Sequence, residues 1–291
     1  MPTLRKLTSM ILVVATLPLC LTVLDAVKAI AQSSPSAYHE QDNQDGPDKS
    51  HIEHTNTFTP FSVTVQILNG DQKGSGIVIR DKSKTLWIAT NRHVVRDSSD
   101  VCIKFPDGEI MTGSVVQSTD MEHDIAFISV RKDRQNGPYA EPATFIDTAA
   151  IDFVVATGYS AETDSYLETA GVTLPILQGK ILKSGYSITY SNQIEKGMSG
   201  GGVFSETGQI IGINALHGDP IWRSDWHDFQ GRRLNSTIGK KLDAVSVGIA
   251  IQMILLDLDR ILTASPLALR SNFKCLMGKT ISITSQSKAK L

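Results

Sequence analysis

Three residues whose side chains can together perform acyl transfer occur in the order His93, Asp124, Ser199. A serine hydroxyl is a weak nucleophile at neutral pH, so it needs an imidazole to accept its proton and a carboxylate to orient that imidazole. The order His, Asp, Ser is one of the chain orders in which such triads occur. The spacing therefore predicts nucleophilic catalysis by Ser199, with His93 as general base and Asp124 as its partner.

The sequence around Ser199 fits this chemistry, because it reads Gly-Met-Ser-Gly-Gly over residues 197–201. Glycines allow a loop to bend tightly against a substrate without a Cβ clash. The backbone N–H groups of Gly197 and Ser199 are then the expected donors to a developing oxyanion. Taken alone, the loop has an alternative reading as an ordinary glycine-rich turn between two strands.

Neighbouring polar residues offer alternatives to two of these assignments. Asp120 is the second choice for the carboxylate, but it sits in a polar turn, whereas Asp124 directly precedes the apolar run 125–128. Adjacent residues of a strand point to opposite faces, so His123 is expected on the outside. His217 is either a substrate contact or a surface histidine.

Four segments of the chain resemble the trypsin-like (chymotrypsin-fold) serine endopeptidases, in the bacterial branch of HtrA-type and glutamyl-endopeptidase-type enzymes. The matching segments are Thr-Asn-Arg-His-Val-Val at 90–95, Asp-Ile-Ala at 124–126, the serine loop at 197–201 and Ile-Gly-Ile-Asn at 211–214. The resemblance covers roughly residues 60–263. It implies a protein or peptide substrate and no cofactor or metal. A catalytically inactive relative that binds peptides in the same cleft is the alternative function.

The same resemblance implies a substrate pocket and argues against one activation route. Gln193, which is neutral, would form the bottom of this pocket. Asn214, Ala215 and Leu216 would run beside the substrate, and Gly248 on the last strand would leave the pocket open. A neutral residue at the bottom of the pocket predicts cleavage after uncharged, small or medium aliphatic residues, because a buried cationic side chain would need a carboxylate there. Met198 replaces the aspartate that pairs with a new N-terminus in activated trypsins, so no such switch is expected.

Short apolar or alternating runs separated by Gly, Asp, Asn and Ser are typical of many short antiparallel strands. They fall at 61–68, 74–80, 85–91, 101–105, 109–118 and 125–130, and at 152–158, 172–183, 185–190, 201–205, 209–216 and 245–251. A polar stretch at 131–149 divides them into two sets. The prediction is an all-β peptidase domain at 59–263. Following the resemblance, it contains two six-stranded antiparallel barrels, at 59–135 and 150–251, and a C-terminal helix at 252–263.

The N-terminal segment has the features of an export signal. Arg5 and Lys6 precede an apolar core at 10–24, and a small-x-small site ends at Ala31, so residues 1–31 are predicted to be a signal peptide. An uncleaved membrane anchor is the alternative reading. Residues 32–58 are polar and are expected to form a linker or a pro-segment. The protein is thus predicted to be secreted or periplasmic, without stable membrane insertion after cleavage.

The C-terminal segment and the composition add three expectations. Residues 264–291 carry five Lys or Arg and no acid, so they are predicted to be a solvated basic tail, too short for the peptide-binding PDZ domain of HtrA proteins. Cys102 and Cys275 are either paired in a disulfide or free. A net charge of −2 and 41% apolar residues argue against a dedicated nucleic-acid binder. The oligomeric state stays open.

Overall fold

The computed structural model describes residues 59–82, 85–118, 120, 122–131, 152–216, 225–264, 273–276 and 279–282. The predicted signal peptide at 1–31 and the predicted linker at 32–58 lie outside these residues, which begin at Thr59. His217 and nearly all of the polar stretch at 131–149 also lie outside them.

The first six strands form a closed antiparallel barrel in the order β1-β2-β3-β6-β5-β4. The strands are β1 (Thr64–Asn69), β2 (Gln72–Lys82), β3 (Thr85–Thr90), β4 (Asp100–Lys104), β5 (Ile110–Gln117) and β6 (Ala126–Arg131). Valine and isoleucine are frequent in these strands, and such β-branched side chains pack well on a pleated surface. Many of them are fully buried, for example Val65, Ile88 and Ile128.

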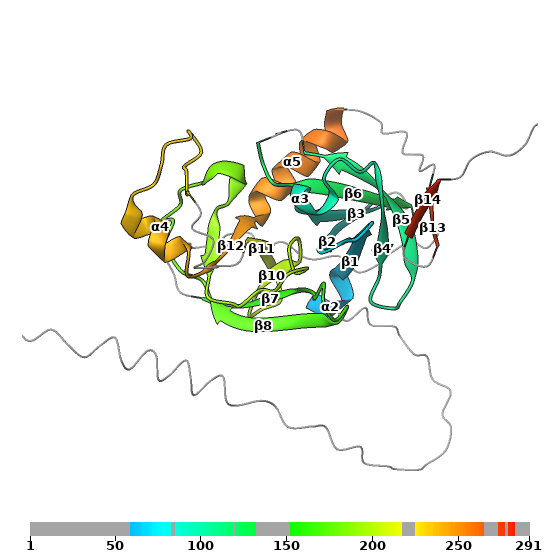
Figure 1. Cartoon of the computed structure of the whole chain (residues 1–291), viewed down its shortest axis with the longest axis horizontal. Helices are drawn as coiled ribbons and strands as arrows, with labels where there is room; N and C mark the ends of the chain where they lie inside the picture. The colour runs from blue at the N-terminus through cyan, green and yellow to red at the C-terminus, as the bar shows by residue number, and fades with distance from the viewer. Residues whose placement is uncertain are drawn as a thin grey trace, which may run out of the picture. The chain divides into compact units, whose positions relative to one another are not determined.

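The next six strands form a second antiparallel sheet in the order β8-β7-β10-β11-β12-β9. They are β7 (Phe153–Tyr159), β8 (Tyr166–Val172), β9 (Ile188–Tyr190), β10 (Gly202–Ser205), β11 (Ile210–Leu216) and β12 (Ser246–Ala250). Its two edges meet where a bridge joins Thr173 to Tyr190, so the sheet curls on itself. The predicted all-β class with two six-stranded units is confirmed, and Figure 1 shows the two groups of strands side by side.

Two of the predicted strands are placed differently in the structure. The run at 61–68 begins with a helical turn, α2 (Pro60–Val63), which Thr59 caps through its side chain. The eighth strand is Tyr166–Val172 rather than 172–183. β8 has hydrogen-bonded strand pairing with β7 along its length and is partly exposed, so its sequence lacks a clear apolar alternation. Leu177 and Leu182, which suggested a strand, are instead buried in loops.

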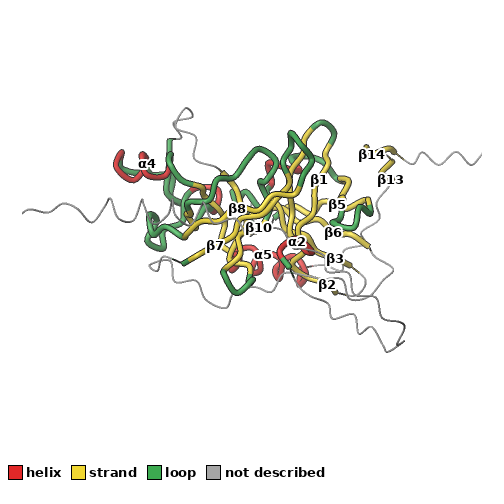
Figure 2. Tube along the Cα trace, turned by 90° about the horizontal axis from the view of Figure 1, so that it is seen from below, coloured by secondary structure: helices red, strands yellow, loops and turns green. Residues whose placement is uncertain are grey.

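The predicted C-terminal helix is confirmed as α5 (Ile251–Ala264). Ile254, Leu258 and Ile261 lie on one side of it and join the apolar cluster that also contains barrel residues such as Val65. A second helix, α4 (Ser236–Leu242), begins at the Asn235 cap and lies at the opposite end of the molecule from β13 and β14 (Figure 2). Among the described residues, no helix has both the length and the apolar character that crossing a membrane requires.

The segment predicted to be a solvated basic tail contains a hairpin in the structure. Strands β13 (Phe273–Leu276) and β14 (Lys279–Ser282) pair with each other and lie beside β5 (Figure 1). A disulfide joins Cys275 of this hairpin to Cys102 of β4, and the Cys275 N–H donates to Thr112 Oγ1 at 3.1 Å. The prediction of a solvated tail was wrong for β13 and β14, because a basic composition does not reveal that Cys275 is bonded to Cys102 in a distant strand.

Candidate active site

His93 is presented by a short helix that is fixed from three sides. Strand β3 ends at Thr90, and α3 (Arg92–Val95) follows it directly. Val94 and Val95 are buried, so the helix is anchored to the barrel by its apolar side. The Asn69 amide donates to the carbonyls of Val94 and Val95 at 3.2 and 3.0 Å, which satisfies groups that a helix end leaves unpaired. The His93 side chain is left 45% exposed.

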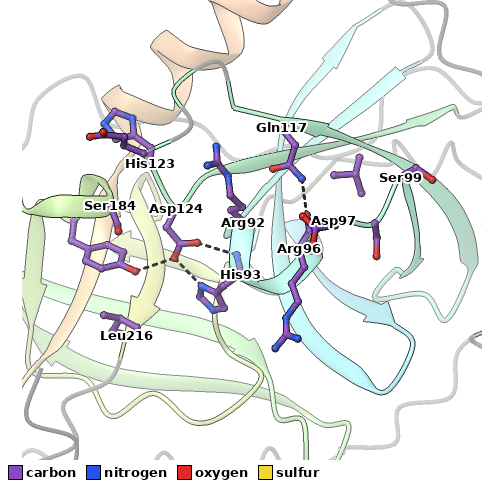
Figure 3. Close-up of a pocket in the computed structure, with 14 residues that line it drawn as sticks. Arg92, His93, Arg96, Asp97, Ser99, Gln117, His123, Asp124, Ser184 and Leu216 are labelled. Carbon is purple, nitrogen blue, oxygen red and sulfur yellow. Dashed lines mark hydrogen bonds and ion pairs between the residues drawn. The ribbon is translucent and has the colours of Figure 1, made fainter.

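Asp124 meets His93 because of the strand register. Thr90 at the end of β3 lies opposite Ala126 at the start of β6, so the residues just beyond these positions come together. The two contacts are His93 Nδ1 to Asp124 Oδ2 at 2.8 Å, and the His93 backbone N–H donating to Asp124 Oδ1 at 3.0 Å (Figure 3). The carboxylate is buried and contacts the backbone nitrogen and Nδ1 of His93, an arrangement that fixes the imidazole tautomer and leaves Nε2 free of Asp124.

Tyr186 is a third partner of this pair that the sequence did not reveal. Its hydroxyl donates to Asp124 Oδ2 at 3.1 Å, and it follows the 3-10 turn Lys183–Gly185 (Figure 3). Burial, and then the nearby Asp124 carboxylate, raise the pKa of Tyr186, so the phenol stays protonated and acts as a donor. The Asp124 N–H also donates to Ser184 O at 2.9 Å. No local pattern signals a contact between residues 62 positions apart.

The Ser199 loop lies against the first barrel, but its hydroxyl points to the second sheet. Ser199 Oγ donates to Ala215 O at 3.3 Å, and the structure contains no hydrogen bond from it to His93. A Cβ on Gly200 would lie 2.2 Å from Ser75 O, and this glycine has φ +83°, so only glycine fits. The structure thus joins His93 to Asp124, while the hydroxyl of Ser199 is hydrogen-bonded to the second sheet.

The two predicted oxyanion donors belong to peptides whose carbonyls are held elsewhere. Lys196 O accepts from the Ala161 N–H at 2.8 Å, and Met198 O accepts from the Gly201 N–H at 3.0 Å. In a trans peptide the N–H points away from the C=O, so the N–H groups of Gly197 and Ser199 point away from these partners. Within the described residues, neither N–H donates to a protein acceptor.

The predicted pocket residues differ in burial and surroundings within the described part of the chain. Gln193 is exposed. Asn214 is fully buried, and its amide donates to Thr157 O at 2.8 Å and Met198 O at 3.2 Å. A Cβ at Gly248 would lie 2.5 Å from Ile213 O, so this position faces packed backbone rather than open space. The side chain of Asn214 therefore has a role in the interior, which its place in the motif did not indicate.

Ala215 and Leu216 differ from the other three. Ala215 is buried, and its carbonyl is the acceptor for Ser199 Oγ. Leu216 lines a cavity of about 1020 Å³ that His93, Asp124 and Tyr186 also line (Figure 3). Residues 217–224, which follow Leu216 in the chain, lie outside the described residues. This cavity therefore gives open space beside His93 and Asp124.

His123 was expected on the outside, and this prediction was wrong. Its side chain is only 14% exposed, its Nε2 lies 3.4 Å from Asp120 Oδ2, and its ring packs 6.0 Å from that of Phe229. Residues 122–125 precede β6, so the alternation of side chains along a strand does not apply to them. Asp120, the second choice for the carboxylate, contacts His123 and not His93.

Met198 is fully buried and packs in the apolar interior of the second sheet with residues such as Val154, Ala156 and Tyr190. It thus contributes apolar contacts at the position where activated trypsins carry an ion pair. The turn is closed by the Met198 N–H donating to Glu195 O at 3.0 Å.

A closed six-stranded barrel beside a second curled sheet of six strands, followed by a helix, defines the class of chymotrypsin-like two-barrel folds. Within this class, residues 74–213 match the family model of the trypsin-like peptidase domain. This segment therefore resembles a trypsin-like peptidase domain, and the chain is similar to HtrA/DegP-like serine proteases.

Two relatives illustrate this similarity. The chain is 26% identical over 153 residues to the serine protease Do-like HtrA of Bacillus subtilis, a match that covers 49% of this chain and 33% of the relative. It is 28% identical over 145 residues to a probable periplasmic serine endoprotease DegP-like of Pseudomonas fluorescens, covering 49% and 29%. The matched region thus spans about a third of the length of these curated relatives.

Two solved structures share the fold. The serine endoprotease from Yersinia pestis superposes with a TM-score of 0.52 at 19% identity, covering 70% of this chain and 64% of that one. The inactive form of the Rv3671c protease superposes with a TM-score of 0.51 at 19% identity, covering 76% and 99%.

Proposed function

We propose that the protein is a serine endopeptidase in which Ser199, His93 and Asp124 form the catalytic triad. Ser199 Oγ attacks the carbonyl carbon of a peptide bond while His93 Nε2 takes its proton, and the N–H groups of Gly197 and Ser199 bind the resulting oxyanion. His93 then gives the proton to the leaving amine, which departs and leaves an acyl-enzyme on Ser199. A water molecule hydrolyses this ester by the same steps, with His93 again as base.

The observation that supports this proposal most is the geometry of His93 and Asp124. One carboxylate accepts from both Nδ1 and the backbone N–H of His93, at 2.8 and 3.0 Å. The bond at Nδ1 leaves Nε2 as the acceptor nitrogen of a neutral imidazole, which is what a general base requires. The His93 side chain borders the cavity that Leu216 lines, where a substrate has access to it.

Ser199 must rotate for the reaction to begin. Its hydroxyl now donates to Ala215 O, at a rather long 3.3 Å. A change of side-chain rotamer moves Oγ from one staggered position to another at small cost. Catalytic hydrogen bonds are often long or misaligned without substrate and shorten when it binds. The mechanism therefore includes a turn of Ser199 Oγ from Ala215 towards His93 Nε2.

Labelling with a fluorophosphonate tests the proposal, because this probe reacts with serines activated by a neighbouring base. The full chain should be labelled and should cleave peptides, and Ser199→Ala should abolish both. A chain that folds but shows neither labelling nor cleavage would instead support the alternative of an inactive domain that binds peptides in its cleft.

For specificity, we propose cleavage after uncharged, small or medium aliphatic residues. Gln193 carries no charge, and Ala215 and Leu216 are apolar. Lys196 is exposed, so water and salt screen its attraction for acidic side chains. Profiling on a mixed peptide library measures the preference, and a dominant selection of Arg, Lys or Glu would contradict it.

We further propose that the protein is exported through the segment 1–31 and acts outside the cytoplasm. The basic flank, apolar core and small-x-small site of that segment support this proposal. The Cys102–Cys275 disulfide supports it too, since structural disulfides persist mainly in oxidising compartments. Sequencing the N-terminus of the mature protein tests it: a start at Gln32 is expected, and an intact Met1 on a membrane-bound protein would contradict cleavage.

A further inference from the structure

Ser75 lies in β2 of the first barrel, yet its polar atoms bind the nucleophile loop of the second. It is fully buried. Its N–H donates to Ser199 O at 2.9 Å, and its hydroxyl donates to Gly197 O at 2.7 Å. The same hydroxyl accepts from the Tyr159 N–H at 2.8 Å, and the Ser75 carbonyl accepts from Thr90 Oγ1 at 2.7 Å. One small residue thus makes four hydrogen bonds to three other segments.

These bonds fix alternate peptides of the loop. Ser75 holds the carbonyls of Gly197 and Ser199, which belong to the peptides 197–198 and 199–200. The peptides 196–197 and 198–199, which carry the two predicted oxyanion donors, are held by groups of the second sheet. The peptide that Ser75 Oγ holds therefore lies directly between the two donor peptides, and its orientation affects both.

The loop needs this restraint because Gly197 allows many backbone conformations. Gly197 has φ +101°, and a Cβ there would lie 2.4 Å from the Ala161 nitrogen, so no other residue replaces it without strain. A glycine peptide rotates readily when its carbonyl is unpaired. Rotation of the 197–198 peptide would change the direction of the neighbouring N–H groups, and misplacement by about 1 Å can cost about 100-fold in rate.

We propose that Ser75 is a positioning residue for the oxyanion hole, through which the first barrel holds the two donors of the nucleophile loop in place. This inference rests on the proposed peptidase function. It gives Ser75 an effect on the chemical step and not on substrate binding, because its side chain is buried behind the loop and touches no described cavity. Its Oγ acts by holding Gly197 O.

The test compares Ser75→Ala with a matched control in the full-length protein. Ser246 is also buried, and its hydroxyl donates at the same 2.7 Å to one carbonyl, Asn192 O, which lies outside the loop 197–201. Ser75→Cys keeps a side-chain donor at this position, although the thiol is larger and donates more weakly. Each variant is assayed for kcat and KM on a fluorogenic peptide, for thermal unfolding, and for inhibition by a peptide aldehyde, whose adduct with Ser199 carries an oxyanion.

Ser75→Ala should lower kcat by about 10- to 100-fold with KM changed less than about twofold, and should weaken aldehyde inhibition by the same factor. Ser75→Cys should fall between this variant and the wild type. Ser246→Ala should lose stability but keep kcat within about threefold.

A kcat of Ser75→Ala equal to that of Ser246→Ala would overturn the inference while leaving the peptidase function intact. If Ser75→Ala does not fold, Ser75→Cys decides, and a folded cysteine variant with wild-type kcat would overturn it. If the wild type itself neither cleaves peptides nor reacts with a fluorophosphonate, the proposed function fails first, and the two failures are thereby distinguished.

Discussion

The two halves of the candidate site are held in different ways. His93 and Asp124 both belong to the first barrel and meet at the ends of two neighbouring strands, β3 and β6. The Ser199 loop belongs to the second sheet, yet its backbone is held by residues of both units, among them Ser75 and Asn214. The contact between His93 and Asp124 (the base half) thus forms within one barrel, and Tyr186 of the second unit adds a further hydrogen bond to Asp124. The backbone of the Ser199 loop (the nucleophile half) is instead held directly from both units.

This difference also appears in the hydrogen bonds of the side chains. The His93 ring already contacts its carboxylate at 2.8 Å, while the Ser199 hydroxyl donates to Ala215 O and not to His93. In the proposed mechanism, the His93–Asp124 pair is therefore formed before substrate arrives, whereas Ser199 requires a local change. Variants of each half should separate these two requirements.

The largest effects should come from removing either half. Ser199→Ala and His93→Ala should each reduce turnover by about a million-fold, and the double variant by little more, because the residues act as a unit. Thermal unfolding should hardly change, since Ser199 Oγ makes one hydrogen bond of 3.3 Å and His93 is 45% exposed. A sensitive fluorogenic assay measures the turnover, and multiplicative losses in the double variant would contradict a shared mechanism.

Asp124→Asn should impair the general-base function of His93 without removing the contact between residues 93 and 124. The amide keeps the shape of the carboxylate but favours the wrong histidine tautomer, so kcat should fall by about ten-thousand-fold. Asp120→Asn is the matched control, because Asp120 contacts His123 and not His93. Its kcat should stay within about twofold of the wild type, as expected for a partly exposed group away from the chemistry. Equal losses in both variants would show that the carboxylate has been misassigned.

The sequence predicts the base half better than the nucleophile half. The motifs around His93 and Asp124 adjoin apolar runs, and the strand register that joins them follows from those runs. The expected two sets of six strands and the C-terminal helix are found for the same reason, since periodic burial leaves a periodic sequence. β8 was missed because it is a partly exposed strand with little alternation.

Contacts between distant segments could not be predicted from the sequence. The contacts of Tyr186 with Asp124 and of Ser75 with Gly197 depend on how the two units pack. The contact of Asn214 with Met198 lies within the second unit, and no local spacing encodes any of the three. Motif position suggested a pocket role for Asn214, but its amide hydrogen-bonds to interior carbonyls. The Cys102–Cys275 pair was left open because pairing requires a distance that composition does not give.

Gly200→Ala should disturb the nucleophile half through the packing of the two units. A Cβ there would lie 2.2 Å from Ser75 O and 2.3 Å from Thr90 Oγ1, and the residue has φ +83°. Gly108→Ala is the control, since Gly108 has φ +85° with no atom within 4 Å of its Cβ position. Both variants should lose about 1–3 kcal/mol of unfolding free energy from backbone strain, and Gly200→Ala more.

Turnover should distinguish these two glycine variants. In Gly200→Ala, kcat should fall by about 100-fold, because the loop must move away from the first barrel. Gly108→Ala should keep wild-type kcat. Thermal unfolding and peptide cleavage measure both quantities, and an active Gly200→Ala enzyme would mean that the loop does not depend on contact with the first barrel.

The smallest effect is expected from Tyr186→Phe, which removes one hydrogen bond from Asp124 and keeps the ring. Asp124 retains both contacts to His93, so kcat should fall by only about fivefold, equivalent to about 1 kcal/mol. Burial and the Asp124 carboxylate raise the pKa of Tyr186, so the phenol remains a donor throughout the range in which peptidases are assayed. The ratio of wild-type to variant kcat should therefore be the same at every pH from about 6 to 10.

The same raised pKa sets the pH dependence of stability. Because the folded state favours the protonated phenol, the contribution of Tyr186 to unfolding free energy is complete below the ordinary tyrosine pKa of 10.0. It declines as pH rises above that value, where the unfolded chain ionises first. Unfolding measured from pH 7 to 11 should thus show the wild type losing more stability than Tyr186→Phe above pH 10. A kcat ratio that approaches one already at pH 9 would mean that Tyr186 ionises early and does not support Asp124 as a neutral donor.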